Sequence, residues 1–284
     1  MSAKIIDGKA VAARLKASLK PRIAALTAKG RQPGLAVILV GTNPASRVYV
    51  NMKRKTCTEL GIYSEEYSLA ETATEAELVA LIQKLNRDDR IHGILLQLPL
   101  PQHLNELKLL ELISPAKDVD GFHPVNCGKL LAGLPGMLPC TPAGVMDLIH
   151  ETGVSVAGKE CVVIGRSNIV GKPQALLLLR EHGTVTVCHS RTADLAAVCR
   201  RADILVSAVG KPELVTAAMV KPGAVVIDVG TSRNAAGKLT GDVDFASVAE
   251  VAGWITPVPG GVGPMTIAKL MENTVISAEG IIKE

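Results

Sequence analysis

Aromatic side chains are scarce in this sequence, which has one Trp, three Tyr and two Phe among 284 residues. Proteins that bind single-stranded nucleic acids stack bases on such rings, and nucleic-acid-binding domains gather Lys and Arg on one face. The net charge here is +4, and the basic residues are scattered apart from the run Lys53, Arg54 and Lys55. We therefore expect no nucleic-acid partner.

Long apolar runs and closely spaced cysteine pairs are absent as well. No uncharged apolar stretch approaches the roughly 18 residues of a transmembrane helix, and charges interrupt the N-terminal segment too often for a signal peptide. None of the six cysteines lies in a Cys-x-x-Cys motif. We expect a cytoplasmic protein with reduced thiols that does not bind membranes.

What the sequence does have is a regular alternation of buried strands and helices. Short apolar runs predict the strands, and helical periodicity predicts the helices between them. This alternation is typical of parallel sheets covered by helices. The predicted strands are 35–40, 91–96, 161–165, 184–188, 203–207 and 224–229, and the predicted helices include 45–60, 75–87, 142–152 and 264–280.

The segment from Asp120 to Pro139 is rich in Gly and Pro and separates two such stretches. We interpret it as the passage between two domains. The helix that follows is expected to use Thr141 as its N-cap and Pro142 as its first residue. The predicted fold class is therefore α/β with two domains, of which the second is a doubly wound, Rossmann-type domain.

A loop bounded by glycines follows the strand at 161–165 and runs from Gly165 through Arg166 and Ser167 to Gly171. Glycines let backbone N–H groups approach a phosphate, and the start of the next helix favours negative charge. The dinucleotide fingerprint G-x-G-x-x-G would need glycine at 167, where Ser167 stands. The loop indicates a nucleotide site, and a plain strand-to-helix turn is the alternative.

The end of the next strand indicates which nucleotide is bound. NAD-specific enzymes commonly place a carboxylate there for the ribose hydroxyl, whereas this sequence has Ser190 and Arg191. A guanidinium and a hydroxyl suit a 2′-phosphate, and Arg166 in the loop favours the same choice. We predict NADP as the cofactor, with solvated surface charges as the alternative.

Candidate chemistry in the first half begins with Tyr49 and Lys53, which lie one helical turn apart on one face. Partial burial would lower the pKa of Lys53 and suit it to proton transfer near neutral pH. A lysine whose stem merely covers apolar surface is the alternative. Gln97 follows the strand at 91–96, where ligands of parallel sheets bind, and its amide is placed to hold both Lys53 and a substrate. A glutamine that only caps a proline-stiffened turn is the alternative.

Two further segments carry candidate groups. Asp118 and Asp120 share one side of an extended segment, but no neighbouring ligand cluster supports a metal, so we expect none. Asp120 is better suited to accept from the N–H groups of a heterocycle, with an Asp-Gly turn as the alternative. The segment 256–265 has three prolines and three glycines, which suits the lining of a flat ligand.

Taken together, these segments resemble one family. The motifs YVNMK, GILLQLPLP, KDVDGFHP, PCTPAG, GRSNIVGKP and TPVPGGVGPMT occur in the order found in the bifunctional methylenetetrahydrofolate dehydrogenase/methenyltetrahydrofolate cyclohydrolase family. The resemblance implies NADP-dependent oxidation of 5,10-methylenetetrahydrofolate and hydrolysis of the product to 10-formyltetrahydrofolate. It also implies a homodimer, for which an exposed apolar sheet edge in the second domain is the expected contact.

The resemblance extends to domains and residues. It implies a folate-binding catalytic domain of residues 1–122 plus 264–284, with the final helix returning to it, and an NADP-binding domain of 140–260. Lys53 would be the acid/base of the hydrolysis, Gln97 would position it, and Asp120 would bind the pterin edge. The expected substrate contacts are Tyr49, Lys53, Gln97, Leu98, Pro99, Asp120, Pro259, Gly260, Gly261 and Val262, and the expected cofactor contacts are Gly165, Arg166, Ser167, Ser190, Arg191 and Thr231.

One departure concerns the segment after the strand at 224–229, where the family commonly has Gly-Ile-Asn-Arg and this sequence has Gly230, Thr231, Ser232 and Arg233. Thr231 stands where a backbone contact to the nicotinamide is expected.

The same motifs leave two alternative functions. Tyr-x-x-x-Lys also marks short-chain NADP oxidoreductases, but there the pair follows the glycine loop instead of preceding it. A catalytically silent folate- or nucleotide-binding protein is the second alternative, and the joint presence of Lys53, Gln97 and Asp120 disfavours it.

Overall fold

The computed structural model describes residues 2–233 and 237–281. It divides into two compact units, one of residues 14–140 and 267–284 and the other of residues 1–13 and 141–266. We call them the three-stranded unit and the six-stranded unit after their main sheets. The boundaries fall inside three helices, which are α1 (Gly8–Ala28), α6 (Cys140–Glu151) and α10 (Val262–Glu279).

The three-stranded unit is built on a parallel sheet with strand order β3-β2-β4. The central strand β2 is buried along its whole length, which agrees with its continuous apolar sequence. The other elements of this unit are β3 (Tyr63–Leu69), β4 (Gly93–Leu96), α2 (Pro44–Leu60), α3 (Glu75–Arg87), α4 (Glu106–Leu110) and α5 (Pro124–Leu131), and β2 spans Gly34–Val40.

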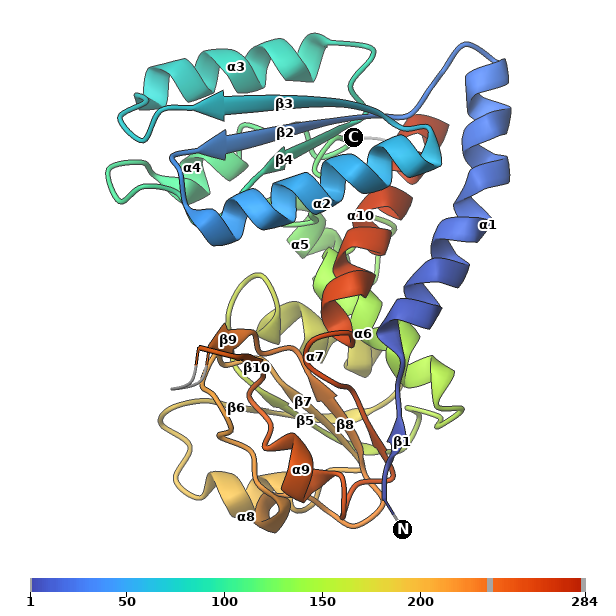
Figure 1. Cartoon of the computed structure of the whole chain (residues 1–284), viewed down its shortest axis with the longest axis vertical. Helices are drawn as coiled ribbons and strands as arrows, with labels where there is room; N and C mark the ends of the chain where they lie inside the picture. The colour runs from blue at the N-terminus through green and yellow to red at the C-terminus, as the bar shows by residue number, and fades with distance from the viewer. Residues whose placement is uncertain (1, 234–236, 282–284) are drawn as a thin grey trace. The chain divides into compact units, whose positions relative to one another are not determined.

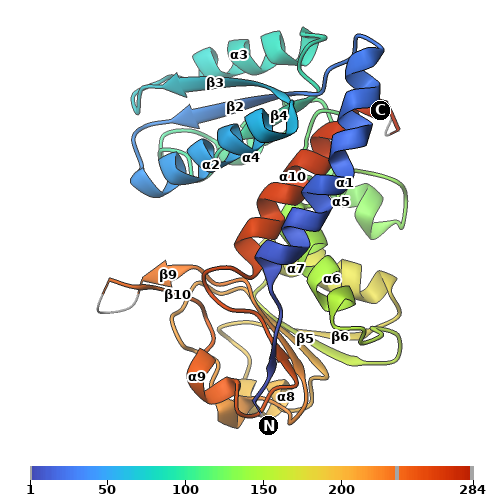
Figure 2. The same ribbon diagram turned by 45° about the vertical axis from the view of Figure 1, so that its right-hand side comes forward.

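The two faces of β2 serve two separate cores because successive side chains of a strand point in opposite directions. Leu35, Val37 and Leu39 pack with residues of α1, α2 and α10. Their neighbours Ala36, Ile38 and Val40 pack with residues of α3 and α4. Figures 1 and 2 show α2 and α3 on opposite faces of this sheet. A capping box between Thr74 and Glu77 starts α3.

The C-terminal part of α10 belongs to the three-stranded unit, which confirms the predicted return of the last helix. Leu270, Met271 and Val275 are almost fully buried in the core that contains β2. Glu279 near the end of the helix accepts two hydrogen bonds from Arg22 of α1, at 2.7 and 2.9 Å. Both views show α10 beside α1.

The six-stranded unit contains one parallel sheet with strand order β1-β11-β8-β7-β5-β6. This confirms the prediction of a doubly wound sheet with helices between its strands. Its elements are β1 (Lys4–Ile5), β5 (Glu160–Ile164), α7 (Gly171–Arg180), β6 (Thr184–Cys188), α8 (Leu195–Cys199), β7 (Ile204–Ser207), η1 (Ala217–Met219), β8 (Val225–Asp228), β9 (Ser232–Arg233), β10 (Leu239–Thr240), α9 (Phe245–Val248) and β11 (Trp254–Ile255).

Some local expectations differ from the structure. Residues 4–5 pair with β11, so the beginning of the chain lies in the six-stranded sheet and not with residues 14–122. The Gly- and Pro-rich passage contains the helix α5, which His123 caps by accepting from the N–H of Val125. Helix α6 begins at Cys140, one residue before the predicted cap, and the hydroxyl of Thr141 is hydrogen-bonded to that of Thr266 at 2.9 Å.

Among the described residues, no helix combines the length and apolar character that crossing a membrane requires. In the same part of the chain, no three His, Cys, Asp or Glu side chains gather as metal ligands.

Candidate active site

Lys53 lies on the inner face of α2 and is only 8% exposed. Its ammonium donates a hydrogen bond to Oε1 of Gln97 at 2.9 Å, and Nε2 of Gln97 donates to the carbonyl of Leu98 at 2.8 Å. The second bond orients the amide so that its oxygen faces the lysine. Burial lowers the pKa of Lys53, against the opposing attraction of Asp120 and Cys140. Lys53 is therefore a buried amine with a fixed neighbour.

Asp120 is brought to the same place by a segment that extends the sheet beyond β4. The N–H of Ile94 donates to the carbonyl of Lys117 at 2.8 Å, and Asp118 forms a parallel bridge with Ile94. A side chain on Gly93 would overlap Val119, so glycine lets this segment approach β4 closely. Because Gln97 follows β4 and Asp120 follows its neighbour, both lie at the carboxyl edge of the sheet.

The carboxyl group of Asp120 has an unusual pKa. Burial raises this pKa to about 6, while Lys53 lowers it and Asp118 raises it further. A carboxyl group whose pKa is raised and an amine whose pKa is lowered make a pair that is able to bind and exchange protons.

Two residues that sequence reasoning missed hold Asp120 in place. The thiol of Cys140 donates to the carbonyl of Val119, the residue before Asp120, at 3.1 Å, and its proximity lowers the pKa of Asp120. From α10, Nδ2 of Asn273 donates to the carbonyls of Val119 at 2.8 Å and Leu138 at 2.9 Å. The motif PCTPAG contains Cys140 and could have pointed to it, whereas Asn273 of α10 lies in no such motif.

Asp118 has a different role from Asp120, although the two were expected to share one side of the segment. Its carboxylate accepts from the N–H groups of Phe122 and His123, at 3.2 and 2.8 Å, and from Nδ2 of Asn126 at 2.8 Å. Asp118 is 2% exposed. These bonds close the turn at Gly121, whose φ of +74° suits glycine. Asp118 is therefore a structural residue of the loop.

Tyr49 lies one turn before Lys53 on α2 and is 37% exposed. Leu98 and Pro99 follow Gln97 directly, with Leu98 half-buried and Pro99 exposed. The structure thus brings Tyr49, Lys53, Gln97 and Asp120 into one unit and leaves a tyrosine ring at its surface.

The glycine loop lies in the six-stranded unit between β5 and α7. A side chain on Gly165 would meet the carbonyl of Ala208, and one on Gly171 would meet that of Gly165, so both positions need glycine for this tight turn. The hydroxyl of Ser167 accepts from the N–H groups of Val170 and Gly171, at 3.1 and 3.2 Å. Ser167 therefore ties the loop to the N-cap residue Val170 and to the first residue of α7.

Backbone donors remain for a ligand in this loop. Within the described residues, the N–H groups of 166–169 have no hydrogen-bond acceptor, and Arg166, Ser167 and Asn168 are exposed. Successive free N–H groups beside a helix start fit the pyrophosphate of a dinucleotide.

Ser190 and Arg191 lie beside this loop, because β6 pairs with β5 and the N–H of Gly165 donates to the carbonyl of Cys188 at 2.8 Å. The turn is fixed by Thr192, whose hydroxyl accepts from the N–H of His189 at 2.9 Å. Ser190 and Arg191 are both exposed. Within the described residues Arg191 makes no ion pair, so its charge is available for a phosphate.

Two buried carboxylates brace the other loops at this edge. Asp228 accepts from the N–H groups of Gly230, Asp242 and Val243, each at 2.9 Å. Asp242 accepts from the hydroxyl of Ser207 and from two backbone N–H groups after β7. Burial raises the pKa of Asp228 to about 6. Sequence reasoning missed both carboxylates, because most of their partners are distant in sequence.

The remaining predicted residues also lie in the six-stranded unit. Thr231 follows β8 and is exposed. The segment Pro259, Gly260, Gly261 and Val262 follows β11 and leads into α10. A side chain on Gly8 would overlap the carbonyl of Gly261, so this loop packs directly on the start of α1.

Comparisons with known proteins agree with this arrangement. Residues 6–120 match the family model described as tetrahydrofolate dehydrogenase/cyclohydrolase, catalytic domain, and residues 139–281 match the NAD(P)-binding domain of the same family. The chain is 60% identical over 279 residues to the bifunctional protein FolD of Acetivibrio thermocellus, and the match covers 98% of each protein.

Solved structures show the same similarity. The bifunctional FolD methylenetetrahydrofolate dehydrogenase/cyclohydrolase of Campylobacter jejuni is 52% identical, with a TM-score of 0.97 over 99% of this chain and 100% of that one. The Trypanosoma brucei enzyme, solved with NADP and an inhibitor, is 40% identical, with a TM-score of 0.95 and full coverage of both chains.

Proposed function

The chain belongs to the tetrahydrofolate dehydrogenase/cyclohydrolase family, and on this premise we propose which of its residues carry the two reactions. The protein is an NADP-dependent methylenetetrahydrofolate dehydrogenase and methenyltetrahydrofolate cyclohydrolase. The observation that carries the proposal is the buried Lys53, held by Gln97 at 2.9 Å near Asp120.

Lys53 is proposed to be the acid/base of the hydrolysis. Neutral Lys53 takes a proton from the water that attacks the methenyl carbon, and the resulting ammonium returns it to the ring nitrogen as the carbon–nitrogen bond breaks. The product is 10-formyltetrahydrofolate, with one proton released overall. Burial lowers the pKa of Lys53 and so increases the share of the neutral amine, the form that acts as a general base.

Gln97 and Asp120 are proposed to position the substrate and the lysine. The Gln97 amide is fixed by Leu98, so it holds the Lys53 ammonium in one direction. The Asp120 carboxylate, braced by Cys140, accepts from the N–H groups of the pterin edge. Tyr49 packs its exposed ring on the flat pterin, and Leu98, Pro99 and the segment 259–262 are further proposed folate contacts.

The oxidation needs no acid or base at the reacting carbon, because a hydride passes directly to the nicotinamide of NADP. The task of the protein is to hold the cofactor in an attack geometry. We propose that Gly165, Arg166 and Ser167 shape the loop for the pyrophosphate, that Ser190 and Arg191 bind the 2′-phosphate, and that Thr231 contacts the nicotinamide through its backbone.

The assignment is tested by two absorbance measurements on the purified protein. With 5,10-methylenetetrahydrofolate present, NADP reduction is expected to be faster than NAD reduction, and the methenyl absorbance is then expected to decay faster with enzyme than without it. A normal dehydrogenase rate in the Arg191→Ala variant would overturn the 2′-phosphate assignment.

We further propose that the protein is a homodimer formed through β6, the edge strand of the six-stranded sheet. Val187 in this strand is 39% exposed, and an unprotected apolar edge favours pairing with a second copy. Light scattering of the native protein is expected to give twice the chain mass. The Val187→Lys variant is expected to give the mass of one chain, and an unchanged dimer would place the contact elsewhere.

We assign the protein to the cytoplasm, because its six cysteines are unpaired thiols and five of them are buried. Recovery of the native protein in the periplasmic or secreted fraction of its source cells would contradict this assignment.

A further inference from the structure

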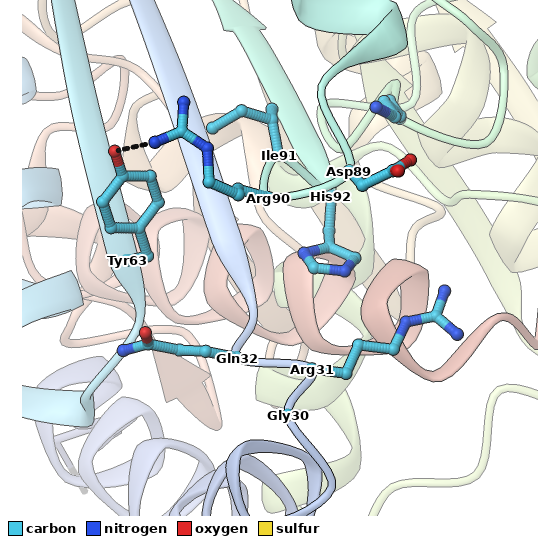
Figure 3. A pocket seen from close by; sticks show the side chains of 9 residues that line it. Gly30, Arg31, Gln32, Tyr63, Asp89, Arg90, Ile91 and His92 are labelled. Carbon is cyan, nitrogen blue, oxygen red and sulfur yellow. Dashed lines mark hydrogen bonds between the residues drawn. The ribbon is translucent and has the colours of Figure 1, made fainter.

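A pocket of about 800 Å³ opens on the three-stranded unit. Apart from Lys117, which precedes the segment that pairs with β4, its lining residues precede or begin the three strands. Gln97 instead follows β4, so the pocket and the proposed catalytic residues lie at opposite edges of the sheet. None of the proposed folate and NADP contacts lines it. The lining residues, shown in Figure 3, are Gly30, Arg31, Gln32, Tyr63, Asp89, Arg90, Ile91, His92 and Lys117.

His92 presents to this pocket a donor that has no partner among the described residues. The residue is 7% exposed, and its Nδ1 accepts a hydrogen bond from the N–H of Gly34 at 3.2 Å. The proton of the neutral ring is therefore on Nε2, and no residue in the described part of the chain accepts from it. Figure 3 shows the ring projecting between the segment Gly30–Gln32 and Arg90. Nε2 is accessible from the pocket, so an acceptor group of a ligand can replace water as its hydrogen-bond partner.

Positive side chains outnumber negative ones in the lining of this pocket, with Arg31, Arg90 and Lys117 against Asp89. Arg31 is exposed and makes no ion pair within the described residues. The ammonium of Lys117 donates to the neutral carbonyls of Leu85 and Asp88, at 3.1 and 2.9 Å, and the carboxylates of Asp89 and Asp88 stabilise its charge from nearby. Both cations are close enough to His92 to lower its pKa together with burial, against the weaker opposing effect of Asp89.

The opposite wall is partly apolar and is formed by Tyr63, Arg90 and Ile91. Arg90 is held by two hydrogen bonds to Asp88, at 2.7 and 3.1 Å, and its guanidinium lies 5.6 Å from the centre of the Tyr63 ring. Ile91 is 1% exposed and completes this side. The Arg90 charge is thus already paired, and the wall offers flat surface to the body of a ligand.

We propose that this pocket binds a small anionic molecule, whose phosphate or carboxylate group accepts from Nε2 of His92 and from the guanidinium of Arg31. Lys117 contributes its charge to the same group, and the Tyr63 and Arg90 wall receives the rest of the molecule. The volume lies within the range of about 300–1,000 Å³ that is common for small-molecule sites.

The experiment follows the imidazole nitrogens of the NADP-bound protein by NMR during titration with inorganic phosphate or with acetate, at constant ionic strength. Bound NADP keeps the probe away from Ser190 and Arg191. We expect a saturable shift of Nε2 of His92 with at least one probe, and the probe that saturates first identifies the anion class.

Arg31→Ala tests the guanidinium, and Arg87→Ala, which removes an exposed arginine of α3, is the matched control. Arg31→Ala is expected to weaken binding of the saturating anion about tenfold, because one charge-assisted hydrogen bond is lost. Arg87→Ala is expected to leave it unchanged, and both variants should retain dehydrogenase activity. A His92 shift that stays linear with both probes, or equal affinities in the two variants, would overturn the proposal.

Discussion

The ammonium of Lys53 and the side-chain oxygen of Gln97 are 2.9 Å apart, although the residues come from different elements of the three-stranded unit. Lys53 belongs to α2, and Gln97 is the residue that follows β4. Because Gln97 itself donates to the carbonyl of Leu98, its amide oxygen is oriented and the Lys53 ammonium is held in one direction. Burial and the hydrogen bond to Gln97 distinguish Lys53 from a lysine that merely extends into solvent, and they suit it to proton transfer.

Lys53→Met is expected to abolish most of the cyclohydrolase activity, by about 10²–10⁴-fold, because general-base catalysis contributes that much. The glycine loop lies in the other unit, so NADP binding should persist. Decay of the methenyl absorbance measures the first effect and NADP titration the second. Lys55→Met is the control, since that side chain is 80% exposed. Hydrolysis at the native rate in Lys53→Met would show that the base is another group.

Gln97→Glu is expected to shift the pH dependence of the cyclohydrolase. A carboxylate beside the ammonium favours its charged form and raises the pKa of Lys53, typically by 1–3 units for such a pair. Since the reaction uses the neutral amine, the rising limb of the pH–rate profile should move to higher pH by about that amount. The exposed Gln83→Glu on α3 is the control. If the two profiles coincide, Lys53 and Gln97 are not coupled during hydrolysis.

Ser190→Asp is expected to reverse the cofactor preference. A carboxylate at the end of β6 repels the 2′-phosphate of NADP and accepts from the ribose hydroxyls of NAD. Because juxtaposed like charges cost several kcal/mol, kcat/KM for NADP should fall by about two orders of magnitude, with a much smaller change for NAD. Initial rates with each cofactor measure this. An unchanged ratio of kcat/KM values would place the 2′-phosphate away from Ser190.

Much of the fold was predictable because buried parallel strands have continuous apolar sequences. The runs at 35–40 and 184–188 coincide with β2 and β6 to within one residue. The strand β3 was not predicted, since it is a half-exposed edge strand in which Tyr and Glu replace the apolar run. The strand β1 was missed because its two residues are defined by pairing with β11, at the far end of the sequence.

The proposed site was predictable to the same extent and for the same reason. Lys53 and Gln97 stand at positions that periodicity and strand ends select, and the structure places them in hydrogen-bonding contact. Asn273 carries no local signal, because its importance comes from carbonyls more than a hundred residues away in the sequence. Asp118 and Asp120 look alike in the sequence, and only their surroundings distinguish a loop brace from a group of shifted pKa.

That distinction predicts opposite effects of Asp120→Asn and Asp118→Asn on stability. Folding raises the pKa of Asp120 to about 6, above the value of about 3.9 in an unfolded chain. As the pH rises, Asp120 loses its proton at a lower pH in the unfolded chain than in the folded protein. The folded state is therefore destabilised by this group as the pH rises from about 4 to about 6. Burying the charged carboxylate of Asp120 costs more free energy than its attraction to Lys53 returns. Asparagine carries no charge and so removes this net cost. Asp120→Asn should raise Tm at pH 7, and the gain should disappear near pH 4.

Asp118→Asn is the matched change, since this carboxylate accepts from two backbone N–H groups and from Asn126. The side-chain NH₂ group of asparagine would face N–H groups that need an acceptor. The free energy of unfolding of the variant should therefore fall by about 1.5–3 kcal/mol, the value of a hydrogen bond to a charged group. Thermal unfolding of both variants at pH 4 and pH 7 measures the contrast. A lower Tm for Asp120→Asn at pH 7 would mean that the attraction between Asp120 and Lys53 outweighs the cost of burying the carboxylate.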